Sequence, residues 1–107
     1  TFNGNGTTIN YNTSDANNRT AIIFNGADYI TLDNFIVDVS AGTYGWGIVL
    51  MNQADNNIIT NCTILSNTSA TSTNYAGLLI NGSATTASTT GSNGNGNQIV
   101  GKGCFVV

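Results

Sequence analysis

The same order of segments is repeated along this chain of 107 residues: an apolar block, an Asn turn, a second apolar block and a variable polar stretch. The blocks at residues 22–24, 48–50 and 78–80 begin successive repeats at intervals of 26 and 30 residues. Because one repeat of this length cannot bury its own apolar face, it has to stack on its neighbours. The Asn residues that follow the three blocks are Asn25, Asn52 and Asn81.

A further repeat is expected at the N-terminus, where "TFNG" at residues 1–4 resembles "IFNG" 22 residues later. The second apolar segments are "YITLDNFIVDV", "NIITNCTIL" and "QIVGKGCFVV". Their apolar residues stand at even spacings, which place them on one side of an extended chain. Ile, Val and Thr also favour strands. The residues interpreted as equivalent are Ile30, Ile58 and Ile99, and, six residues further on, Ile36, Ile64 and Phe105.

Short strands in a repeat can share one core when they stack about 4.8 Å apart. We therefore expect an all-β solenoid of about four coils with open ends. An antiparallel sandwich is the alternative, but a sandwich does not require successive segments to look alike. In the favoured register Ile48 and Leu50 point inward and Met51 forms a local bulge. The predicted core is Ile22, Phe24, Ile30, Leu32, Ile36, Ile48, Leu50, Ile58, Ile64, Leu78, Ile80, Ile99 and Phe105.

The segments "GADYITLDNF" and "ADNNIITNCTI" resemble the right-handed parallel β-helix repeats of the pectate-lyase-like superfamily, especially those of large secreted bacterial surface proteins. The resemblance covers residues 21–107. It implies a single β-helix domain over residues 1–107, or a segment of a longer repeat protein, at an extracellular or cell-surface location. The superfamily contains lyases, hydrolases, adhesins, tailspikes and scaffolds, so the resemblance does not by itself imply a function. The polar stretch at residues 83–97 departs from the repeat and is expected to form a surface loop.

Charge and hydropathy exclude two classes of partner. Lys and Arg together number two and the net charge is −3, whereas nucleic-acid binding depends on clustered cations. No apolar run approaches the roughly 20 residues that span a bilayer. We therefore expect neither nucleic-acid binding nor membrane insertion.

The acidic residues do not suggest an active site. Polysaccharide hydrolases need carboxylates close together, but the five Asp residues are spread along the repeats, and the chain has no Glu or His. Asp28 and Asp55 occupy similar places and are interpreted as corner residues that bind backbone N–H groups. Arg19 and Lys102 lie too far apart for a joint site. We expect no enzyme activity, no catalytic residue, no metal and no cofactor.

The sequence contains candidate residues for two kinds of contact with sugars, covalent attachment of glycans and stacking on aromatic rings. Asn-x-Ser/Thr sequons begin at six positions including Asn61, and the attachment sites expected in turns or loops are Asn5, Asn12, Asn18, Asn67 and Asn81. Exposed rings could also stack on a sugar, and the candidates are Tyr44, Trp46 and Tyr75.

The two cysteines, Cys62 and Cys104, have two interpretations. They are either buried small apolar residues or a disulfide between neighbouring layers.

Open sheet edges invite pairing with further strands. The chain ends in the apolar stretch "KGCFVV". The favoured function is therefore a structural extracellular β-helix building block, whose partners are copies of itself, stacked end to end in a filament, or adjoining repeats of a long surface or fibre protein. The alternative is a carbohydrate-binding or polysaccharide-degrading β-helix module.

Overall fold

The computed structural model of this protein describes residues 1–91, 94–100 and 105–106. This part of the chain contains strands and no helix, so the prediction of an all-β chain is confirmed. The strands are β1 (Phe2–Asn3), β2 (Thr8–Asn10), β3 (Thr20–Asn25), β4 (Thr31–Asp33), β5 (Ile36–Asp38), β6 (Gly45–Met51), β7 (Ile58–Thr60), β8 (Thr63–Leu65), β9 (Tyr75–Ile80), β10 (Gln98–Val100) and β11 (Phe105–Val106).

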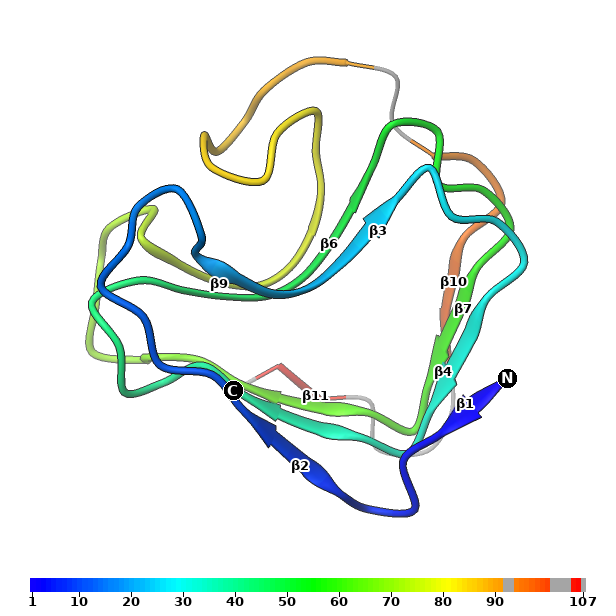
Figure 1. Cartoon of the computed structure of the whole chain (residues 1–107), viewed down its shortest axis with the longest axis horizontal. Coiled ribbons are helices and arrows are strands. Elements are labelled where there is room, and N and C mark those ends of the chain that lie inside the picture. The colour runs from blue at the N-terminus through cyan, green and yellow to red at the C-terminus, as the bar shows by residue number, and fades with distance from the viewer. Residues whose placement is uncertain (92–93, 101–104, 107) are drawn as a thin grey trace.

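These strands form three sheets. Sheet 1 has the order β1-β4-β7-β10, sheet 2 has β11-β8-β5-β2, and sheet 3 has β3-β6-β9. All pairings between these strands are parallel, which excludes the antiparallel sandwich. The chain visits sheets 1, 2 and 3 in the same order each time, and we call one such run a pass. Figure 1 shows the sheets as the sides of a ring, with strands of successive passes one behind another.

Sheet 3 aligns the three apolar blocks as the sequence predicts. Ile22 pairs with Ile48, which pairs with Leu78, and Leu50 pairs with Ile80. The repeated blocks are therefore neighbours in space, one pass apart.

Two details of the predicted alignment are wrong. Met51 forms no bulge, because it continues strand β6 in register with Asn25. Phe2 is not equivalent to Phe24 of "IFNG", because it pairs with Leu32 and places β1 in sheet 1. The shared letters "FNG" reflect two different corners of the ring.

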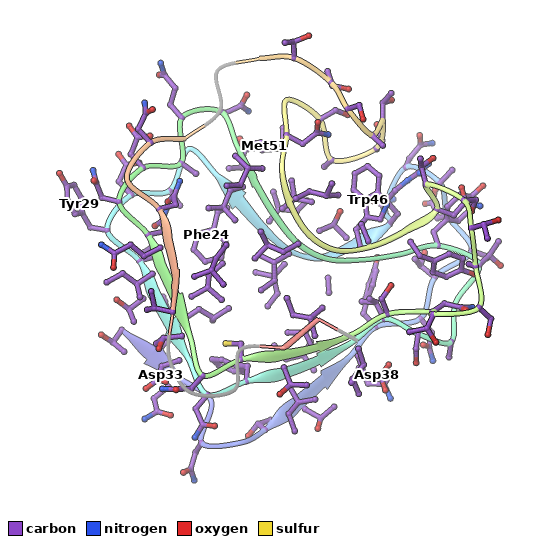
Figure 2. All side chains as sticks on the ribbon, turned by 180° about the vertical axis from the view of Figure 1, so that it is seen from behind. Phe24, Tyr29, Asp33, Asp38, Trp46 and Met51 are labelled. Atoms are coloured by element: carbon purple, nitrogen blue, oxygen red, sulfur yellow. The ribbon has the colours of Figure 1, made fainter. Side chains whose placement is uncertain are left out.

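The interior of the ring is apolar, and side chains from all three sheets meet there. Figure 2 shows Phe24 pointing into this space. Burying side chains of this kind is worth about 1.5–3 kcal/mol each. Five predicted core residues belong to the buried cluster: Phe24, Leu32, Ile48, Leu50 and Ile64. Its other members are Val37, Val39, Ala54, Ile59 and Cys62.

Ile36 and Ile58 do not face the interior as predicted. Both are half-buried, whereas Val37 and Ile59 have 0% and 1% of their surface exposed. The even-spacing rule holds only within one continuous strand. Asn34, with φ at 59°, turns the chain between β4 and β5 and shifts the inward positions by one residue.

The predicted equivalences are also wrong for Ile58 with Ile30 and Ile99, and for Ile64 with Ile36 and Phe105. Ile99 pairs with Ile59, and both Ile36 and Phe105 pair with Thr63. Ile58 pairs with Thr31, whereas Ile30 precedes β4 and its N–H donates to the side chain of Asn57. Three predicted core residues are half-buried and pack against the cluster: Ile22, Ile30 and Leu78.

Ile80 and Ile99 are not buried as predicted, since 45% and 47% of their surfaces are exposed. They occupy inward positions, opposite Leu50 and Ile59, but each lies in the last described strand of its sheet. A further strand would be needed to cover them. The side chain of Phe105 lies outside the described residues.

Asparagine at the corners explains part of the unusual composition. Asn5, Asn34 and Asn61 have φ values of 50°, 59° and 54° and stand between the sheet 1 and sheet 2 strands of successive passes. Asn adopts this left-handed conformation more readily than other non-glycine residues. The corner between sheets 1 and 2 therefore selects Asn.

Tyr29 adopts a left-handed backbone conformation that is unfavourable for tyrosine. Its φ is 57° at the corner before β4, where the equivalent residues of later passes are Asn56 and Gly96. Its side chain is 78% exposed. We expect Tyr29→Asn to raise the free energy of unfolding by up to about 1 kcal/mol, because Asn tolerates this backbone at lower cost.

Urea denaturation checks this prediction, with Tyr29→Phe as the control. The control keeps both the backbone conformation and the ring, so its midpoint should equal that of the parent. A Tyr29→Asn midpoint at or below that of Tyr29→Phe would contradict the explanation.

Candidate functional site

The two equivalent aspartates are corner residues, as the sequence predicts. Asp28 Oδ1 accepts a hydrogen bond from the Asp55 N–H at 2.8 Å, and Asp55 Oδ1 accepts one from the Asn95 N–H at 2.7 Å. Each carboxylate therefore ties one pass to the next. The part of the chain that the structure describes contains no group of three His, Cys, Asp or Glu side chains that could hold a metal ion.

Asp38, the last residue of β5, instead accepts hydrogen bonds within its own turn. The Ser40 hydroxyl donates to Asp38 Oδ1 at 2.6 Å, and the Ser40 N–H donates to the same oxygen at 3.0 Å. These two hydrogen bonds, the hydroxyl first, hold the pKa of Asp38 below its ordinary value of 3.8.

This pKa predicts a small loss of stability in acid. A lowered carboxyl pKa stabilises the fold above pH 3.8, and the stabilisation is lost as the pH falls through the folded pKa. Because Asp38 is half-buried and water still screens its carboxylate, we expect the contribution to be below about 1 kcal/mol. Urea titrations at pH 6 and at acid pH should show a smaller acid loss in Asp38→Asn than in the parent, and equal losses would contradict this assignment.

The three aromatic candidates do not form a sugar platform. Trp46 is fully buried, and its indole N–H donates to the Thr73 carbonyl at 2.9 Å. Tyr75 is half-buried, and its hydroxyl donates to the Gly42 carbonyl at 2.6 Å. Tyr44 is half-buried beneath the Arg19 guanidinium, whose central carbon lies 4.6 Å from the ring centroid. Trp46 is therefore a packing residue rather than a surface for stacking sugars.

The sequons differ in accessibility. Asn5, Asn12 and Asn18 are exposed and Asn67 is half-buried. Asn81 is unsuited to carry a glycan, because it is only 4% exposed. Its amide nitrogen donates to the Ser83 and Thr86 carbonyls, and its side-chain oxygen accepts from the Thr89 N–H. Asn81 instead shapes the start of the segment that follows β9.

That segment has two parts. Residues 81–91 pass outside sheet 3 (Figure 1), where the Thr20 hydroxyl donates to the Ala84 carbonyl at 3.4 Å. Residues 94–97 instead continue the corner stack: Asn97 Oδ1 accepts from the Asn57 N–H, and its amide donates to the Ala54 carbonyl. The loop predicted over residues 83–97 thus ends in an ordinary corner.

Cys62 is buried in the core, and its sulfur lies 3.3 Å from the Thr60 carbonyl oxygen. Its predicted partner Cys104 lies outside the described residues. The disulfide therefore stays a prediction.

The strands of the first pass form an edge that we call the leading edge: β1, β2 and β3. Each pairs on one side, with β4, β5 and β6 respectively. No strand within the described ranges pairs with their other side. The backbone groups along the leading edge are therefore open to a further strand.

An apolar pocket of about 200 Å³ lies at this edge. The sequence did not predict it, because its walls come from both the first and second passes. Phe2 and Ile23, two of its lining residues, are 60% and 45% exposed. No charged or hydrogen-bonding side chain lines it; the full lining is Phe2, Ile22, Ile23, Phe24, Ala27, Ile30 and Leu32.

The opposite end also exposes apolar side chains. Ile80 ends β9, and Ile99 and Val100 end β10, with 43–47% of their surfaces exposed.

Within the described residues, no helix has the length and hydropathy to cross a membrane. A comparison of the chain with protein families, with curated proteins and with solved structures found no match.

Proposed function

We propose that this chain is a right-handed parallel β-helix of about four coils that serves as a structural building block of an extracellular fibre or long surface protein. Its neighbours are adjoining repeats of the same protein or further copies of this chain. The extracellular assignment rests on the resemblance of the repeat to those of secreted surface proteins.

The observation that carries this proposal is that inward apolar side chains are exposed at both ends of the stack of strands. Inward positions are fully covered in the middle passes, at Leu50 and Ile64, but uncovered at Phe2 on one side and at Ile99 on the other. Apolar side chains in these positions are expected to be buried by a further coil. Connections between parallel strands of one sheet are nearly always right-handed. We therefore propose the right-handed form of the β-helix.

The size of the ends also fits an interface. The molecule measures 32 × 31 × 18 Å, and the short dimension runs through the ring in Figure 1. An ellipse with the two long dimensions as axes covers roughly 800 Å², which is about the area per partner in a stable protein interface. Each end could thus support a specific contact.

Light scattering after gel filtration, together with negative-stain electron microscopy, tests the proposal. We expect the 107-residue chain to associate into linear assemblies as its concentration rises. A chain that remains a monodisperse monomer at high concentration would eliminate the filament form. The variant Ile99→Lys should weaken the association, whereas Thr68→Lys, in the exposed stretch after β8, should not.

The carbohydrate alternative gains no support from the aromatic residues, since its central ring, Trp46, is fully buried. We therefore make no second proposal.

A further inference from the structure

Strand β3 is the longest unpaired strand of the leading edge. It has six residues, against two in β1 and three in β2. One side of β3 pairs with β6. A sheet edge of this kind can bind an extended segment, which pairs through its main chain and places alternate side chains in pockets.

The pocket supplies the second requirement for such binding. It lies beside β3, and three of its lining residues, Ile22, Ile23 and Phe24, belong to that strand. Its volume of about 200 Å³ exceeds that of an engineered cavity of about 150 Å³ that accepts benzene. The pocket therefore suits an apolar side chain of ring or branched-aliphatic size, and its uncharged lining disfavours a charged one.

The repeat itself indicates what covers such a strand. In β6, Ile48 and Leu50 are fully buried between the equivalent residues of β3 and β9. At the edges of the same sheet, Ile22 is only half-buried and Ile80 is 45% exposed. Phe24 on the same edge is already only 5% exposed, so a further sheet 3 strand is needed to complete the burial of Ile22 rather than that of Phe24.

Strand β3 is the sheet 3 strand of the first pass, and within the described residues no strand pairs with its outer side. The pocket lies at this same edge.

We infer that the β3 edge and its pocket are a strand-acceptor site for a single extended segment of the sheet 3 type. The segment runs parallel to β3, carries aliphatic residues at alternate positions and inserts one of them into the pocket. The sequence "YAGLLI" of β9 has this character. This inference rests on the proposed β-helix, because it uses the positions of the strands in successive coils.

A synthetic peptide with the sequence of residues 75–82, "YAGLLING", tests the site on the full chain. We expect saturable binding in fluorescence anisotropy and slower hydrogen exchange at the β3 amides. Phe2→Lys should weaken binding by about tenfold or more, because it removes an apolar wall of the pocket. Tyr29→Lys is the matched control, since Tyr29 is exposed but does not line the pocket, and it should leave binding unchanged.

Three outcomes would overturn the inference. The peptide does not bind, it binds equally well after its first leucine is N-methylated, or Phe2→Lys has no effect. In the sheet 3 register the N–H of this leucine faces β3, so N-methylation removes main-chain pairing while it keeps the apolar side chain. If the chain assembles into fibres but ignores the peptide, the strand-acceptor site is wrong and the building-block function stands; if it binds the peptide but never assembles, the filament form is the one that is wrong.

Discussion

The variant Trp46→Ala is expected to lose about 3–5 kcal/mol of unfolding free energy. Trp46 is fully buried, so its removal leaves a cavity among β6 and its neighbours. The indole N–H also donates to the Thr73 carbonyl at 2.9 Å, and the Arg19 guanidinium carbon lies 5.1 Å from the ring centroid. Since domains of this size are stable by about 5–15 kcal/mol, the variant should lose a large part of its stability and unfold at a lower urea concentration.

Urea denaturation followed by circular dichroism measures this loss, and Trp46→Phe is the matched control. Phenylalanine retains most of the apolar volume but lacks the N–H that satisfies Thr73. We expect the control to lose less than half as much as Trp46→Ala. A Trp46→Ala variant as stable as the parent would show that the indole does not hold this region together.

The same pair of variants separates packing from sugar recognition. If Trp46 served as a stacking surface, Trp46→Ala would lose sugar binding while remaining folded. Its burial predicts the opposite result, a loss of stability without a loss of sugar binding by the folded protein. Glycan binding by the parent, measured in parallel, completes the comparison.

The sequence predicts the repeats well where strands are long and poorly where they are short. In sheet 3, six- and seven-residue strands carry contiguous apolar blocks, and their alignment is as expected. Sheets 1 and 2 consist of strands of two or three residues separated by left-handed corners. One corner residue shifts the alternation, so Val37 replaces Ile36 on the inside.

The pocket at the leading edge was beyond prediction from the sequence for a different reason. Its walls join Phe2 of sheet 1, Ile22 and Phe24 of sheet 3 and Ala27 of the corner, and that juxtaposition depends on the pairing of β1 with β4. The shared letters "FNG" indicated instead that Phe2 is equivalent to Phe24. An alignment of "TFNG" with "TLDN" would have placed Phe2 correctly, opposite Leu32.

Asn57 provides the other large expected effect. Its side chain is 1% exposed, its Oδ1 accepts from the Ile30 N–H at 2.8 Å, and its amide donates to the Ala27 carbonyl at 2.6 Å. Asn57→Leu keeps the volume but leaves both backbone groups without a partner. Each unsatisfied buried group costs about 1–3 kcal/mol, so we expect a total loss of about 2–6 kcal/mol.

Asn25→Leu is the matched control for this prediction. Asn25 also bonds to the neighbouring pass, where its Oδ1 accepts from the Asn52 amide at 2.6 Å, but it is exposed and water can replace that bond. We expect its loss to stay below about 1 kcal/mol. Equal losses in the two variants, measured by urea denaturation, would refute the explanation from burial.

The variant Asn57→Asp tests the hydrogen-bond directions within the same corner. Its carboxyl can still accept from the Ile30 N–H, but when ionised it repels the Ala27 carbonyl and is buried without a counter-charge. Burial should raise the pKa of this carboxyl in the folded state, so the variant should gain stability as the pH falls through that pKa. The parent should show the reverse slope, because the lowered pKa of Asp38 removes stability in acid. Urea midpoints at several pH values would therefore move in opposite directions in the two proteins, and parallel curves would show that a carboxyl at position 57 is not desolvated in the folded state.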